Sequence, residues 1–269
     1  MSEMTRVEAG DAALGRWAGR LADGQHPVPL SVALHLLPGV LVAVAYFAAG
    51  VPVAGALGYP PLFGLLLAAA FVLVPSQLGF LLYLGWRRNG RPSLEGIVLY
   101  RDRTPARRFV VLCLLLFAWA WIAGAALSWA DGLVFERLFS WVPERYLVGQ
   151  GLGIQTAEYP RSAVLVTLLV GLVVSGVAAA AVEEYYFRGY LLPRISRLGA
   201  WAPVFNTVLF ALYHLWTPWQ AISRIASILP AAYVVQRTRN FRIYLWVHCA
   251  LNTSGILLTL AAVLAGVAP

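Results

Sequence analysis

The chain has 269 residues, of which 60% are hydrophobic and only 12% are charged. A soluble domain carries about a quarter charged residues. A single soluble domain of this size could not hide so much apolar sequence from water. The composition therefore excludes an ordinary soluble globular protein and predicts one whose surroundings are largely lipid.

The net charge of +8 could suggest a nucleic-acid partner. The arginines, however, lie in short segments between apolar runs. The positive-inside rule of membrane proteins produces this placement. We therefore expect a lipid bilayer, and no nucleic acid, as the partner of the charged segments.

Residues 1–28 contain several acids and no early apolar core, so they do not resemble a cleavable signal peptide. Within them, residues 12–21 mix Leu and Trp with Arg, which is compatible with an interfacial amphipathic helix or with a polar tail.

Apolar segments follow along the rest of the chain, and a membrane-spanning helix needs roughly 20 such residues. The expected spans are 30–50, 60–86, 109–130, 162–186, 201–217, 218–236 and 241–266. Breaks are expected around Gly199 and at Trp216–Trp219. The sequence thus predicts an all-α, polytopic transmembrane bundle of about 7–8 spans with a membrane-embedded polar site.

The arginine bias predicts the orientation of the bundle. The segment 87–108 is rich in Arg and should be cytoplasmic, whereas 131–161 is richer in acids and should lie outside, along the interface. The arginines of 194–197 and 237–242 then fall on the inner side. The N-terminus is expected in the cytoplasm and the C-terminus outside.

Ionisable residues inside spans are costly, so each is a functional hypothesis. Glu183 and Glu184 end an apolar run, and Arg188 follows Glu184 at i+4. At that spacing the guanidinium can face Glu184 and neutralise it. Glu183 lies about 100° around the helix and is left available. The pattern predicts one structural and one working carboxylate.

Two further pairs, Phe210-x-x-x-His214 and His248-x-x-x-Asn252, each place both side chains on one helical face. If the helix that carries Glu183 turns near residues 197–198, Glu183 lies about 22 Å before the turn. His214 would lie about 20 Å back along the antiparallel partner. These nearly equal depths predict that the two side chains meet.

This set of residues suits hydrolysis by water. A carboxylate can act as a general base, a neutral imidazole can orient the water, and an Asn amide can stabilise an oxyanion. No Ser has an evident His–Asp partner. Cys249, next to His248, would point about 100° away on a helix. The chain has two cysteines, Cys113 and Cys249. They indicate neither a disulfide framework nor a Cys-based metal motif.

The order of these motifs resembles the CPBP family, which contains the type II CAAX prenyl endopeptidases and bacterial bacteriocin-processing and self-immunity (Abi) proteins. The resemblance is carried by Glu183-Glu184-x-x-x-Arg188, Phe210-x-x-x-His214 followed by Pro218, and His248-x-x-x-Asn252. It covers roughly residues 160–260. We accordingly divide the chain into an N-terminal tail (1–28), an N-terminal transmembrane region (29–160) and a CPBP-like catalytic transmembrane core (161–269).

The resemblance implies a role for each motif residue. Glu183 would activate water with the help of His214, and His248 with Asn252 would line the oxyanion side. Glu184 and Arg188 would brace the site. The family has been described both as metal-dependent and as glutamate-type.

The sequence leaves the cofactor open. Glu183, His214 and His248 would suffice for zinc, but the chain has no H-E-x-x-H motif. We favour catalysis without a cofactor and keep zinc as the alternative.

The expected function is an intramembrane endopeptidase acting on a membrane-anchored protein or peptide: a CAAX-type C-terminus, a leader peptide or a C-terminal sorting signal. The expected location is the bacterial inner (plasma) membrane. Two alternatives remain: a non-catalytic immunity or binding protein on the same scaffold, and a proton-coupled transporter, since Glu and His chains also relay protons. The transporter alternative lacks visible repeats.

Three other polar residues receive structural interpretations. A lone intramembrane His often makes a helix–helix hydrogen bond, and this remains the structural alternative for His214 taken alone. His26 and His35 are interpreted as incidental. For Arg224 we favour a packing or snorkelling role over one that faces the site.

Overall fold

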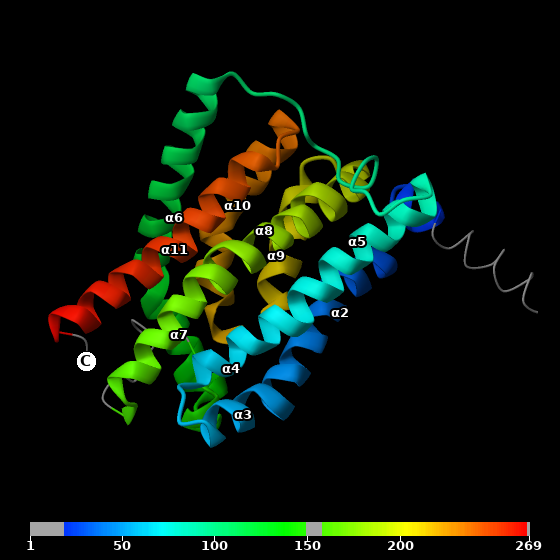
Figure 1. Cartoon of the computed structure of the whole chain (residues 1–269). Coiled ribbons are helices and arrows are strands. Elements are labelled where there is room, and N and C mark those ends of the chain that lie inside the picture. The colour runs from blue at the N-terminus through cyan, green and yellow to red at the C-terminus, as the bar shows by residue number, and fades with distance from the viewer. Residues whose placement is uncertain (1–18, 149–157, 268–269) are drawn as a thin grey trace, which may run out of the picture.

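The computed structural model describes residues 19–148 and 158–267, and these residues are almost entirely helical (Figure 1). The α-helices are α2 (Val28–Ala45), α3 (Val51–Ala56), α4 (Pro61–Ala68), α5 (Val74–Asn89), α6 (Ala106–Val134), α7 (Arg161–Val173), α8 (Ala180–Glu183), α9 (Trp201–Tyr213), α10 (Ala221–Thr238) and α11 (Arg242–Ala265). In the described ranges the only β-type pairing is an isolated bridge between Arg101 and Asn240. The all-α prediction is confirmed.

Short π-helical segments join several α-helices into longer rods. The π-helical segments are η1 (Tyr46–Gly50), η2 (Ala69–Leu73), η3 (Phe135–Phe139), η6 (Val174–Ala179) and η7 (Glu184–Leu191), and the 3-10 segments are η4 (Glu144–Tyr146), η8 (Leu192–Leu198) and η9 (Pro218–Gln220). Four of the rods begin directly after an extended proline, at Pro27, Pro60, Pro105 and Pro160. Because proline cannot donate a backbone hydrogen bond, it suits a helix start.

Five of these rods are long and apolar enough to cross a membrane: Val28–Ala56, Pro61–Asn89, Ala106–Phe139, Arg161–Leu198 and Arg242–Ala265. The described residues are thus those of a polytopic helical bundle. The other two expected spans correspond to α9, which has only 13 residues, and to α10, which carries Arg224 and Arg237. These two helices form an antiparallel pair between the fourth and fifth rods. If both helices cross the membrane, or if the pair enters it and returns to the same side, the chain reaches α11 on the same side of the membrane. The expected orientation of α11 is the same in both arrangements.

The breaks in the C-terminal half lie where the sequence places them. Gly199 and Ala200 separate η8 from α9, and residues 214–217 separate α9 from η9. Gly199 has φ 58°, a backbone conformation that favours glycine. The fourth rod continues well beyond the expected end at residue 186, and it carries Glu183, Glu184 and Arg188 in its second half.

Two arginine-rich segments that the sequence places on one side of the membrane do lie together. The Phe241 amide donates to the Tyr100 carbonyl at 2.9 Å, and the Asp102 amide donates to the Arg239 carbonyl at 2.8 Å. The segments around residues 100 and 240 therefore share one end of the bundle.

That end also holds Arg194 and the described part of the N-terminal tail. The buried Arg194 guanidinium donates to the carbonyls of Ala22 (2.6 Å), Ile97 (2.9 Å) and Tyr190 (2.8 Å). Residues 12–18 of the expected interfacial helix lie outside the described residues. The expected outer segment 131–161 begins as a continuation of α6, and Tyr46 donates a 3.1 Å hydrogen bond to the Tyr146 carbonyl.

The helices that carry the site pack closely against one another. The helix α10 lies against α6 and α9, α11 lies against α6 and α7, and α2 lies against α9 (Figure 1). A Cβ atom at Gly39 of α2 would collide with the Tyr213 carbonyl at the end of α9. Small residues allow such close approach between membrane helices. The end of α9 is therefore held firmly beside α2.

Candidate active site

Glu183 is the last residue of a short α-helical turn between two π-helical segments, η6 and η7. A π turn breaks the regular hydrogen-bond ladder and frequently occurs at functional sites. One result is visible at Ser175 in η6, whose carbonyl accepts a 3.0 Å hydrogen bond from Asn252 Nδ2 of α11. A Cβ atom at Gly176 would lie 2.9 Å from Thr253 Oγ1, so glycine permits this approach of α11.

Glu184 is fully buried and holds two partners with a single oxygen. Its Oε1 accepts from Arg188 Nη1 at 3.2 Å and from His248 Nδ1 at 2.9 Å. The Arg188 guanidinium is also buried, 4.1 Å from the ring centre of Phe210 and 5.2 Å from that of Tyr244. These contacts fit the bracing role expected for Glu184 and Arg188. They also show a second function of Glu184, which is to orient His248.

The contact with Glu184 defines which nitrogen of His248 carries a hydrogen. A carboxylate that pairs with an arginine can only accept, so Nδ1 of His248 donates to it. In the neutral ring, Nε2 is then the acceptor, and it lies 3.8 Å from Oε2 of Glu183. His248 therefore connects the two neighbouring carboxylates.

Glu183 is almost fully buried, with 4% of its surface exposed. Among the residues that the structure describes, no arginine lies within ion-pair distance of its carboxyl group. Its side chain interacts with the Tyr213 hydroxyl, which accepts from Gln77 Nε2 at 3.0 Å. Gln77, Tyr213 and Glu183 thus form a chain from the second span to the candidate base.

His214 follows the last residue of α9 and leaves the helical conformation, with φ −79° and ψ 61°. Its Nδ1 lies 2.8 Å from the Phe210 carbonyl. Because a carbonyl can only accept, Nδ1 is the donor and Nε2 of the neutral ring is the acceptor. The Phe210 ring contacts the His214 ring at 4.8 Å and fixes its plane.

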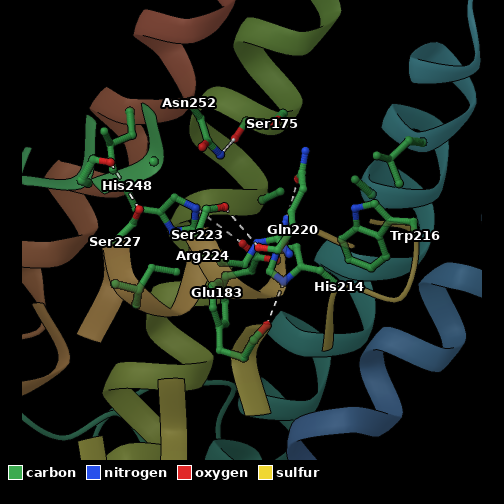
Figure 2. A pocket seen from close by; sticks show the side chains of 18 of the residues that line it. Ser175, Glu183, His214, Trp216, Gln220, Ser223, Arg224, Ser227, His248 and Asn252 are labelled. Atoms are coloured by element: carbon green, nitrogen blue, oxygen red, sulfur yellow. Dashed lines mark hydrogen bonds and ion pairs between the residues drawn. The ribbon is translucent and has the colours of Figure 1, made fainter. Parts of the chain in front are cut away.

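A cavity of about 690 Å³ joins these groups. Glu183, His214, His248 and Asn252 all line it (Figure 2), and they come from α8, from the end of α9 and from α11. The opposite wall is apolar and belongs to the N-terminal region: Leu62, Leu65, Leu66, Ala69, Leu73, Ala120 and Trp121. Its volume suits a ligand of drug size, such as a short peptide segment. The N-terminal spans therefore form part of the site.

Three residues of this arrangement are missing from the sequence-based site. Gln77 and Tyr213 position Glu183, and Arg224 lines the cavity rather than reaching to an interface, so the favoured packing role of Arg224 does not describe its place. A glutamine within an apolar span was the available signal for Gln77. Tyr213 gave no signal, since an aromatic residue before a histidine is ordinary in a membrane helix.

His26 and His35 are more firmly placed than the sequence suggests. Both are buried. His35 Nε2 lies 3.0 Å from Asn206 Nδ2, and this amide also donates to the Phe187 carbonyl at 3.1 Å. His35 therefore ties α2 to α9 behind the site. Cys249 points to the Val177 carbonyl and is not among the residues that line the cavity.

The donor set does not form a metal cluster. In the described part of the chain, no group of three or more His, Cys, Asp or Glu side chains is arranged to hold a metal ion. Glu183, His214 and His248 share the cavity. Glu184 and the Phe210 carbonyl each accept from Nδ1 of one imidazole, which is also the usual outer partner of a metal-ligating His, so Nε2 of each ring is left free.

The fold and the site together define a polytopic helical membrane protein with a buried Glu–His–Asn cavity. Residues 165–254 match the family model for type II CAAX prenyl endopeptidase Rce1-like proteins. The chain therefore carries a Rce1-like domain of the CPBP/CAAX protease family, as the motifs predict, and this domain contains Glu183, Glu184, Arg188, His214, His248 and Asn252. The match supports CAAX-type intramembrane peptide hydrolysis. Comparison with curated proteins and with solved structures finds no match.

Proposed function

We propose that this protein is a glutamate-type intramembrane endopeptidase, in which Glu183 activates a water molecule to cleave a membrane-tethered or C-terminal peptide. One observation carries the proposal. Of two adjacent buried carboxylates, Glu184 is held by Arg188 and His248, while Glu183 faces the cavity with no described arginine within ion-pair distance. An ion-paired carboxylate is a poor base, and an unpaired one beside a cavity is available to water.

The reaction follows from the tautomers of the two histidines. Water in the cavity donates one hydrogen to Glu183 and another to Nε2 of His214. Its oxygen forms a bond to the scissile carbonyl carbon as Glu183 takes the proton. Glu183 then returns that proton to the amide nitrogen as the carbon–nitrogen bond breaks. A water nucleophile thus gives a carboxylic acid and an amine without a covalent enzyme intermediate.

Asn252 and His248 lie on the side of the developing oxyanion. An asparagine amide has two hydrogens, and one of those of Asn252 is used by the Ser175 carbonyl. The second can donate to the oxyanion. His248 can donate from Nε2 when both of its nitrogens carry hydrogens, with Glu184 accepting from Nδ1. Removing one such donor typically lowers turnover by about 10²–10³-fold.

The decisive experiment replaces Glu183 with Gln, which removes the base and keeps the shape. Purified wild-type and variant protein are compared on a prenylated peptide, a leader peptide and a C-terminal sorting segment in the same detergent. We expect the variant to lose hydrolysis and to keep the thermal unfolding midpoint. Near-normal turnover by Glu183→Gln contradicts the assigned role. Absence of hydrolysis by wild-type protein on all substrate classes favours a binding or immunity protein.

We place the protein in a bacterial inner membrane with its N-terminus in the cytoplasm. The arginine-rich segments around residues 100 and 240, which share one end of the bundle, then face the cytoplasm.

A further inference from the structure

One wall of the cavity carries an arginine, Arg224, in the first turns of α10 (Figure 2). Its guanidinium donates to Thr217 Oγ1 at 3.0 Å and to Gln220 Oε1 at 2.9 Å, and it lies 3.5 Å from the Thr217 carbonyl. All three acceptors are neutral. They belong to the turn between α9 and α10 and hold the side chain at the cavity wall.

Arg224 differs in this respect from Arg188, the other arginine near the site. Arg188 lies against a carboxylate, Glu184. No described carboxylate lies within ion-pair distance of Arg224. Glu183 and Asp131 interact with it at longer range, and Asp131 is held by the backbone amide and hydroxyl of Ser223.

A cation in a low-dielectric cavity is costly unless a counter-charge is nearby. The planar guanidinium also matches a carboxylate through two parallel hydrogen bonds. A cavity that already has apolar walls and the candidate base therefore presents, at Arg224, a site for an anionic group of its ligand. In a peptide ligand cut inside this cavity, that group is the terminal carboxylate.

We propose that Arg224 binds the free C-terminal carboxylate of the peptide that is cleaved at Glu183. This inference rests on the proposed function and narrows its substrates to peptides cut near their C-terminus. The cavity of about 690 Å³ accommodates a short segment, and an extended chain advances roughly 3.3–3.6 Å per residue. Arg224 thereby selects a peptide bond a few residues from the chain end over an internal bond of a longer chain.

The test compares two prenylated peptides of identical sequence, one with a free C-terminal carboxylate and one with a C-terminal amide. We expect wild-type protein to cleave the free acid with a kcat/KM at least about tenfold higher, and a tenfold ratio corresponds to about 1.4 kcal/mol. Arg224→Gln should bring this ratio close to one, and Arg224→Lys should retain part of it. Arg237→Gln, on the exposed last turn of the same helix, should leave the ratio unchanged.

Equal cleavage of the acid and the amide by wild-type protein overturns the proposal. So does an Arg224→Gln variant that slows both peptides by the same factor, because Arg224 then acts at the reacting bond. Binding of both peptides to Glu183→Gln separates this inference from the proposed function. If neither peptide is cleaved but the free acid binds at least tenfold tighter than the amide, the carboxylate site at Arg224 is supported and the hydrolytic function is contradicted. If Arg224→Gln does not fold, the wild-type acid-to-amide ratio and Arg224→Lys decide.

Discussion

Replacing Glu184 with Gln should destabilise the protein much more than the same change at Glu183. Glu184 is the described carboxylate that lies against the buried Arg188, and both side chains are 0% exposed. Breaking a buried ion pair by removing one partner costs about 3–5 kcal/mol. The amide oxygen of Gln can still accept a hydrogen bond from Arg188 or His248, so we expect the lower end, about 3 kcal/mol.

This loss converts into a measurable change in unfolding temperature. For proteins of this size, 1 kcal/mol shifts the midpoint by roughly 2–4 °C. Glu184→Gln should therefore lower the unfolding midpoint by about 6–12 °C. Unfolding is followed in detergent by the fluorescence of the ten tryptophans. Glu183→Gln is the matched control and should stay near wild type, because Glu183 has no arginine to leave unpaired.

A double variant separates the lost ion pair from a general packing defect. Glu184→Gln with Arg188→Met removes both charges, and replacing a buried pair by apolar residues is often neutral or stabilising. We expect the double variant to recover most of the lost stability. A Glu184→Gln protein as stable as wild type, or a double variant less stable than the single one, would refute the reasoning.

Three further predictions follow from the site and the topology. Tyr213→Phe should reduce kcat about tenfold or more with little change in KM, because Glu183 loses its interaction with the Tyr213 hydroxyl. Gln77→Leu should reduce kcat less. Unchanged kcat in both variants contradicts this positioning role. Cleavage should persist in strong chelator with well under one zinc per chain, and zinc-dependent loss and return of activity would show a metalloenzyme. In a protein with Cys113 and Cys249 replaced by Ala, single cysteines introduced in 101–108 should be labelled only from the cytoplasm. Single cysteines at residues 268–269, which lie outside the described part, should be labelled only from outside.

The sequence by itself determined the solvent of the protein, its helical class and the residues of the Rce1-like domain. Composition and the length of the apolar runs sufficed, because a bilayer tolerates few structures other than helices with internally satisfied backbones. The i,i+4 spacing likewise predicted the contact between Glu184 and Arg188, since that pair lies on one helix. The turn at Gly199 could be placed for the same local reason.

Only the tertiary structure decided which distant groups contact these residues. The sequence could not show that His248 of α11 takes its orientation from Glu184, or that Gln77 of the second span reaches Glu183 through Tyr213. It also could not show that α4 and α6 supply the apolar wall, or that Arg224 faces the cavity. Helical periodicity fixes which residues share a face, but the rotation and crossing of each helix depend on packing against its neighbours.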